Sequence, residues 1–182
     1  MVKARTFWLL YVTCLLLADC QRDQIQTYQI PKESPPRVTA PAGAVKEIEW
    51  KVPEGWQEQS PSSMRVGSFL VKGPAGRQAD VSVIPLAGEA GGDLFNINRW
   101  RGQINLGPIS ASELPQQSQT IMPAGHKMLL VEFASRNRRL VAAIYPRGGR
   151  TWFFKMTGED AIVKSAKPSL MQFLKSVKFN ER

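Results

Sequence analysis

Two neighbouring segments in the second half of the chain, residues 126–134 and 139–145, are apolar at both odd and even positions. The apolar residues are Met128, Leu129, Leu130, Val131 and Phe133 in the first segment and Leu140, Val141, Ala142, Ala143, Ile144 and Tyr145 in the second. Successive side chains of a strand point to opposite faces of its sheet. Strands that are apolar on both faces are covered on both faces. We therefore expect a sheet with other elements packed against both of its sides.

Further patterns supply the other strands and the covering helices. Strands are predicted over residues 45–52, 64–72, 79–86 and 150–157. A helix is predicted to begin with Asp93 as its N-cap and to end at Gly107-Pro108. A second helical region begins at Glu159 and is broken or restarted at Pro168. Its apolar stripe is Leu170, Phe173, Leu174 and Val177. The predicted fold class is α+β, a mostly antiparallel sheet with helices packed on it.

The N-terminus combines a charged start, a short apolar run and a cysteine. Lys3 and Arg5 precede the run Phe7–Leu17, which is too short to span a bilayer and has the length of a signal-peptide core. The next residues, Leu17-Ala18-Asp19-Cys20, resemble the lipobox of bacterial lipoproteins, although Asp19 replaces the usual small residue. The resemblance implies acylation of Cys20. We predict a lipoprotein signal peptide over 1–19, the lipidated cysteine with a flexible tether over 20–42, and one α+β domain over 43–182.

The predicted location is the cell envelope, with the domain anchored by lipid and facing the periplasm. Gln21 follows the cysteine, where an aspartate is the usual signal for retention at the inner membrane, so the outer membrane is favoured. The tether is punctuated by Pro31, Pro35, Pro36 and Pro41 and has no apolar periodicity. An uncleaved membrane anchor and a plain secretory signal are the alternatives.

Few residues in the chain can carry out catalysis or bind a metal. His126 is the only histidine, and the two cysteines, Cys14 and Cys20, lie in the signal peptide and at the lipidation site. Disulfides, zinc–thiolate sites and cysteine nucleophiles are thereby excluded from the mature domain. The chain has no Gly-x-Ser-x-Gly motif for a serine triad. We expect a non-enzymatic accessory or binding module without metal or cofactor. One alternative is an envelope hydrolase that holds His126 in a cleft with an acid and a hydroxyl group. The other is a protein that binds an anionic envelope polymer by charge alone.

The charge of the chain suggests its partners. Lys and Arg number 24 and Asp and Glu 15, which gives a net charge of +9. The arginines of the two hairpin turns, Arg136, Arg138 and Arg139 and then Arg147 and Arg150, should form two small patches at opposite ends of the sheet. No aromatic residues alternate with them on a predicted exposed surface, so nucleic acid is not an expected partner. Expected partners are the membrane through its lipid anchor, an envelope protein and an anionic ligand or envelope polymer.

The helix predicted from Asp93 carries the candidate ligand-binding residues Arg99, Trp100 and Arg101. At 100° per residue, Arg101 falls on the apolar face of this helix together with Trp100. A buried arginine must be paired, and Glu132 is the one acid in the apolar strand 128–133. We predict an Arg101–Glu132 ion pair, with Asp80 and Glu89 as competing partners because both are near the helix in sequence. The alternative is that Arg101 and Trp100 line a pocket for an acidic or ring-bearing ligand.

Two family resemblances accompany these patterns. The segments Asn96-Ile97-Asn98-Arg99-Trp100-Arg101-Gly102-Gln103 and Thr151-Trp152-Phe153-Phe154-Lys155-Met156-Thr157-Gly158 resemble a family of uncharacterised predicted bacterial lipoproteins. The order of elements, with Val52-Pro53-Glu54-Gly55-Trp56 and the final helix, is similar to the PsbP-like fold of photosystem accessory proteins. That second resemblance implies an accessory or binding role and assigns no site residue.

Overall fold

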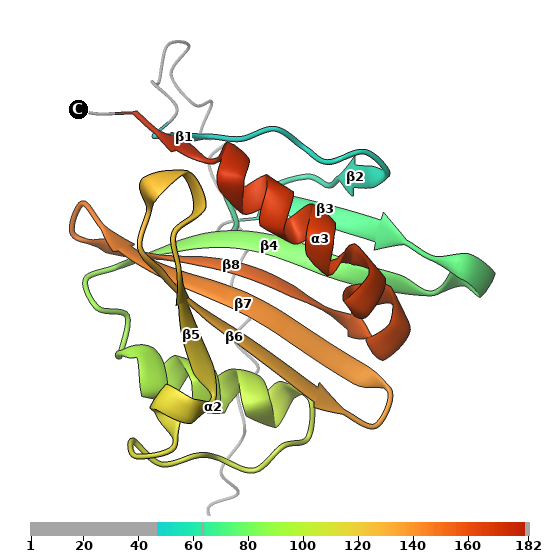
Figure 1. Cartoon of the computed structure of the whole chain (residues 1–182). Helices are drawn as coiled ribbons and strands as arrows, with labels where there is room; N and C mark the ends of the chain where they lie inside the picture. Colours follow the sequence, from blue (N-terminus) through green and yellow to red (C-terminus); the bar gives the residue numbers. More distant parts are fainter. Residues whose placement is uncertain (1–46, 63, 181–182) are drawn as a thin grey trace, which may run out of the picture. The chain divides into compact units, whose positions relative to one another are not determined.

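A twisted seven-stranded antiparallel sheet forms the centre of the computed structural model, which describes residues 47–62 and 64–180 (Figure 1). Its strands are β2 (Trp56–Glu58), β3 (Gly67–Lys72), β4 (Gln78–Ala87), β5 (Ser118–Ile121), β6 (Met128–Ser135), β7 (Arg138–Arg147) and β8 (Arg150–Glu159). The strand order is β2-β3-β4-β8-β7-β6-β5. The long central strands β4, β7 and β8 are therefore hydrogen-bonded on both sides.

Each face of this sheet is covered by one helix. Helix α3 (Asp160–Ser176) packs on one face and α2 (Asp93–Gln103) on the other. Neighbouring residues of β8 enter the two cores: the ring of Phe153 lies 5.5 Å from that of Trp100 on α2, and the ring of Phe154 lies 6.4 Å from that of Phe173 on α3. The prediction that these strands are covered on both faces is confirmed.

Short elements complete the fold. Strands β1 (Ile48–Glu49) and β9 (Lys178–Phe179) form a two-stranded antiparallel ribbon that joins the two ends of the described chain. Three 3-10 turns, η1 (Pro74–Gly76), η2 (Leu114–Gln116) and η3 (Pro123–Gly125), connect longer elements. No described helix is long and apolar enough to cross a bilayer.

The predicted fold class, α+β with a mostly antiparallel sheet, is confirmed, but several element boundaries differ. Helix α3 runs without a break through Pro168, whose exposed side chain lies on the solvent side of the helix. The N-cap of α2 is Gly92, and Asp93 is its first helical residue, without a capping side-chain bond. The strand expected over 45–52 is limited to β1, while β2, β5 and β9 were not predicted because two to four residues carry too little periodicity. Cys20 and the tether lie outside the described residues.

Candidate functional site

Helix α2 separates its three predicted ligand-binding residues. Trp100 is 2% exposed and packs edge-on against Phe153, so it belongs to the core and has almost no surface to offer a ligand. Arg99 is exposed and donates a hydrogen bond from Nη2 to Oδ1 of Asn96, at 2.9 Å. Trp100 therefore does not line the ligand pocket that was predicted for it and Arg101.

The predicted Arg101–Glu132 ion pair is wrong. Arg101 lies with its guanidinium 4.8 Å from the centre of the Phe133 ring, and its Nε donates a 2.8 Å hydrogen bond to the carbonyl oxygen of Gly107. Glu132 precedes Phe133 in β6 and therefore points to the opposite face of the sheet, where it pairs with Lys167 of α3. The Phe133 ring and the Gly107 carbonyl oxygen therefore take the place of the carboxylate that was expected to pair with Arg101.

One end of the sheet collects basic side chains from two turns and one helix. At the right-hand end of Figure 1, the β3–β4 turn, the β6–β7 turn and the junction of β8 with α3 lie together, because antiparallel strands alternate in direction. The basic residues are Lys72, Arg77, Arg136, Arg138, Arg139, Lys164 and Lys167. The acidic residues are Glu132, Glu159 and Asp160. We call this region the basic end; its residues leave an excess of four positive charges.

An ion network neutralises three of the basic residues. Glu132 accepts hydrogen bonds from Arg139 and Lys167, and Arg139 also bonds Asp160, at 2.9 Å. Arg77 lies 3.7 Å from Glu159. Burial alone would raise the pKa of Glu132, but the hydrogen bonds and charges of Lys167 and Arg139 outweigh it and hold that pKa below its ordinary value. These groups are therefore structural, and their charges are already satisfied.

The other four cations of the basic end are Lys72, Arg136, Arg138 and Lys164, and none forms an ion pair with another described residue. We call them the unpaired cations. All four are exposed. Arg136 occupies a tight turn with φ of 50°, in the left-handed region that glycine adopts most easily. Strained residues of this kind concentrate at functional sites. The unpaired cations are thus available to a partner.

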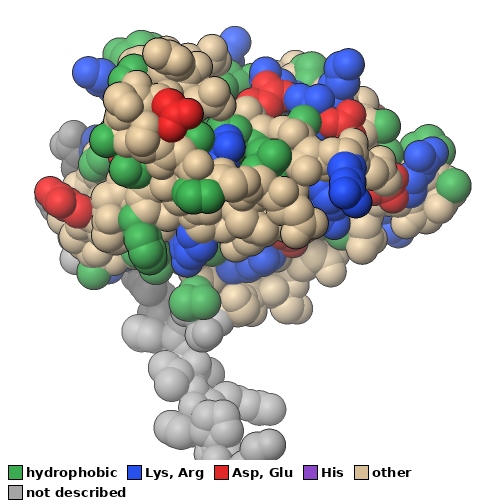
Figure 2. All heavy atoms as spheres, turned by 90° about the horizontal axis from the view of Figure 1, so that it is seen from below, with side chains coloured by type: hydrophobic (Ala, Val, Ile, Leu, Met, Phe, Trp, Pro, Cys, Tyr) green, Lys and Arg blue, Asp and Glu red, His purple; other side chains and the backbone are tan. Residues whose placement is uncertain are grey.

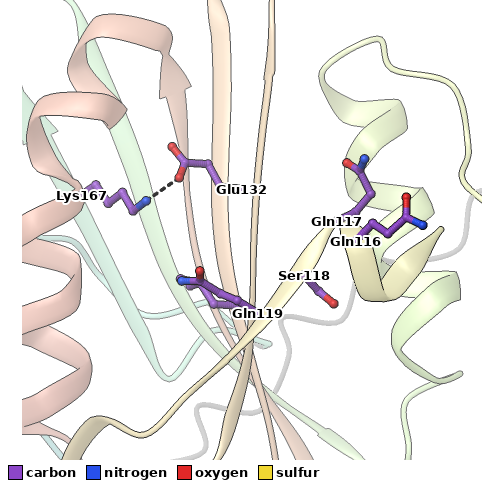
Figure 3. A pocket seen from close by; sticks show the side chains of 7 residues that line it. Gln116, Gln117, Ser118, Gln119, Glu132 and Lys167 are labelled. Carbon is purple, nitrogen blue, oxygen red and sulfur yellow. Dashed lines mark hydrogen bonds and ion pairs between the residues drawn. The ribbon is translucent and has the colours of Figure 1, made fainter.

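A polar hollow of about 250 Å³ opens between β5 and α3, beside the ion network. Figure 3 shows Glu132 and Lys167 pointing toward each other on one side, with Gln119 reaching from β5 toward that side and Gln116 and Gln117 across the hollow. Ser118 and Leu130 complete the lining. We call this cavity the glutamine hollow.

The opposite end of the sheet holds two larger hollows but balanced charges. Hollows of about 610 and 550 Å³ share the β7–β8 turn with its Arg147 and Arg150. Their acidic lining residues are Glu47, Glu89 and Asp93. Arg150 pairs with Glu47 at 2.8 Å, and the Arg147 guanidinium lies 5.2 Å from the Phe179 ring. This end therefore lacks the excess positive charge found at the basic end.

His126 lies near the same end, where its Nδ1 is 3.1 Å from the hydroxyl oxygen of Tyr145. Its ring also meets that of Phe179 edge-on, with centroids 5.4 Å apart. The hydroxyl group beside His126 is thus a phenol in an aromatic cluster. Among the described residues, no group of three or more metal-ligating side chains is found.

A second polar patch lies beside α2, on the face of the sheet that α2 covers. Figure 2 shows this face, on which basic side chains (blue) are more widespread than acidic ones (red). Lys155 donates to Gln103 at 3.0 Å, and Arg65 pairs with Asp80 at 2.8 Å. Burial lowers the pKa of the Lys155 ammonium; Asp80 opposes this shift and nearby arginine charges add to it. These groups satisfy one another, although the buried Ser82 hydroxyl has no hydrogen-bond partner in the described part of the chain.

Comparison with known proteins finds solved structures of low similarity. No family model and no curated protein matches it. Similar solved structures include LpqN of Mycobacterium tuberculosis, involved in cell envelope biogenesis, at 14% identity and TM-score 0.45, over 74% of this chain and 83% of that one. Cyanobacterial PsbP from Synechocystis is 14% identical with a TM-score of 0.46, over 74% of this chain and 87% of that one. A Pseudomonas aeruginosa protein of unknown function is 16% identical with a TM-score of 0.42, over 75% of this chain and 99% of that one. These are weak likenesses of fold alone, and membership of the predicted lipoprotein family stays a prediction.

The predicted hairpin arginines lie at opposite ends of the sheet, as their turns implied, but most residues of the basic end were not singled out from sequence. Lys164 and Lys167 are three positions apart on α3, a spacing that places them on one face of the helix. Three glutamines fall within Gln116-Gln117-Ser118-Gln119. The lysine spacing and the glutamine run are both visible in the sequence, but neither indicates that α3 and residues 116–119 lie at the same hollow.

Proposed function

We propose that the chain is a lipid-anchored, non-enzymatic module of the cell envelope that binds an anionic partner through its basic end. The observation that carries the proposal is the set of unpaired cations, four exposed positive charges from two turns and one helix without a carboxylate partner among the described residues. Charge complementarity of this kind steers association and selects partners.

The lipid anchor in this proposal rests on the N-terminal pattern that ends at Cys20. We expect the membrane fraction of the producing bacterium to contain a mature chain that begins with an acylated Cys20. Mass spectrometry of its N-terminal peptide tests this, and a Cys20→Ala variant should keep its signal peptide uncleaved. A mature chain that starts at any other residue, without lipid, would rule out the anchor.

The surroundings of His126 support a binding role over the hydrolase alternative. A general base of a serine triad needs a carboxylate to orient it and an activated hydroxyl beside it. The described polar contact of His126 is with Tyr145, and its ring packs against Phe179. We expect a His126→Asn variant to bind the partner as well as the parent chain does.

Charge reversal tests the basic end directly. We expect the mature lipoprotein, in neutral detergent, to be retained on immobilised poly-L-glutamate and to be released by salt. The Arg136→Glu/Arg138→Glu variant should lose retention at a much lower salt concentration than the parent. Its matched control is Lys127→Glu/Lys178→Glu, which makes the same change in net charge with exposed lysines outside the basic end. Equal weakening by both variants would show that only total charge matters and would contradict the proposed site.

A further inference from the structure

The glutamine hollow borders the basic end and shares groups with its ion network. Glu132 lines the hollow and is bonded by Arg139, while Lys167 lines it from α3 (Figure 3). Lys164, one of the unpaired cations, lies three residues before Lys167 and hence on the same face of α3. A polymer lying across this region would meet the hollow and the cations together.

The lining of the hollow both donates and accepts hydrogen bonds. A glutamine side chain offers two donors and one acceptor oxygen. The side chains of Gln116, Gln117 and Gln119 make no hydrogen bond to another described residue, and all three are exposed. Ser118 borders the hollow as part of β5, but its side chain points away from Gln119 and donates its hydroxyl proton to the Leu114 carbonyl at 2.8 Å, so the glutamines and Lys167 supply the hydrogen-bonding groups. The hollow therefore suits a ligand whose groups do both, as sugar hydroxyls do.

Other ligand classes fit the hollow less well. A phosphate or carboxylate group only accepts hydrogen bonds, and here it would face the Glu132 carboxylate and the glutamine carbonyl oxygens. An apolar ligand would find Leu130 alone, which is 2% exposed. At about 250 Å³ the hollow is smaller than the ~300–1,000 Å³ typical of drug-sized ligands. Its volume and chemistry match one sugar ring.

We propose that the glutamine hollow is a subsite for one neutral sugar ring of an acidic polysaccharide, whose anionic groups the unpaired cations hold. The inference rests on the proposed function and names the chemical class of its partner. No aromatic residue lines the hollow for a sugar to stack on, so a single ring binds weakly. The cations raise the effective concentration of the ring at the hollow, and the two contacts together provide the affinity.

The test compares two anionic polymers on the mature lipoprotein. Hyaluronan alternates neutral and acidic sugars, whereas poly-L-glutamate carries charge without sugars. We expect the Gln117→Ala/Gln119→Ala variant to bind hyaluronan about tenfold more weakly, the loss of roughly two hydrogen bonds. Its affinity for poly-L-glutamate should stay within twofold. The matched control is Gln57→Ala/Gln172→Ala, two exposed glutamines outside the hollow, which should leave both affinities unchanged.

The outcomes separate this inference from the proposed function. A parent chain that binds poly-L-glutamate as tightly as hyaluronan, with no effect of the hollow variant, overturns the sugar subsite and leaves the anionic partner in place. Equal weakening toward both polymers also overturns it, because the glutamines would then act through the cations. A parent chain that binds neither polymer overturns the proposed function itself.

Discussion

Glu132 and Phe133 are adjacent in β6, and this adjacency decides the partners of both side chains. Phe133 faces α2 and carries the Arg101 guanidinium over its ring, while Glu132 faces α3 and binds Arg139 and Lys167. A half-buried arginine does not require a carboxylate where an aromatic face and a carbonyl oxygen are available. At the scale of single residues, the face of the strand determines the partner.

We expect Arg101→Met and Glu132→Gln to act independently on stability. Arg101→Met should cost about 1–2 kcal/mol, from a cation–π contact and one hydrogen bond. Glu132→Gln should cost about 1–3 kcal/mol, because its partners are half-buried. Denaturant titrations of both single variants and the double variant should give a coupling below about 0.5 kcal/mol. The Glu132→Gln/Arg139→Met pair, whose side chains touch, is the control and should show a larger coupling.

The lowered pKa of Glu132 predicts acid sensitivity. Because the native pKa lies below the unfolded value of about 4.3, the unfolded state binds the proton more readily. The stabilisation is complete above that unfolded value and is lost as the pH falls through the native pKa. The difference in unfolding free energy between the parent and Glu132→Gln should therefore shrink as the pH falls below about 4.3. A difference that is constant with pH would contradict this role of the ion network.

We predict that Arg136 lowers the stability of the folded chain and contributes to binding of the anionic partner. Its φ of 50° favours glycine, so Arg136→Gly should raise the unfolding free energy by about 0.5–1 kcal/mol. The same variant should elute from poly-L-glutamate at lower salt than the parent. Ala75→Gly, at a φ of 54° in the β3–β4 turn, is the control that should gain stability without losing retention. Retention unchanged in Arg136→Gly would remove Arg136 from the binding surface.

At the scale of elements, β4 and β8 approach each other closely at the basic end, and glycine makes this approach possible. A Cβ atom at Gly158 would lie 2.7 Å from the Ala79 Cα and 2.7 Å from the Gln78 carbonyl oxygen. Both are backbone atoms of β4, so a side chain there could be accommodated only by moving the strand. This contact holds together the strands that lead into the β3–β4 turn and α3.

Gly158→Ala should therefore destabilise the protein by about 3 kcal/mol or more, the upper range for overpacking. Gly102 in α2 is the matched control, because a Cβ atom there meets nothing within 4 Å. Gly102→Ala should stabilise by about 0.5–1 kcal/mol through helix propensity. Thermal unfolding of the two variants should move the midpoints in opposite directions. A Gly158→Ala variant as stable as the parent would show that β4 can move to accommodate the added methyl group at little cost in free energy.

At the scale of the whole molecule, one sheet separates two cores. Phe154 belongs to the core under α3, with Phe173, and Phe153 belongs to the core under α2, with Trp100. Since domains of this size have unfolding free energies of about 5–15 kcal/mol, neither core is dispensable. The basic end depends on both layers, because its charges come from the sheet turns and from α3.

We expect Phe153→Ala and Phe154→Ala each to cost about 3–5 kcal/mol, with one cooperative transition in each variant. Circular dichroism and tryptophan fluorescence followed through the same urea titration should give the same midpoint. Diverging midpoints for Phe153→Ala would mean that the α2 layer unfolds separately from the rest.

The sequence by itself determined the layers of this fold, because apolar periodicity is a local property of each strand and helix. The doubly apolar strands 126–134 and 139–145 required cover on both faces, and the stripe from Leu170 to Val177 identified a covering helix. Only the tertiary structure decided which charges meet. The alternation of side chains along β6 places Glu132 on the face of Lys167 and away from Arg101. Two turns and α3 bring Lys72, Arg136 and Lys164 to one end of the sheet. Side-chain pairing and charge clustering depend on contacts between distant segments, which no local period encodes.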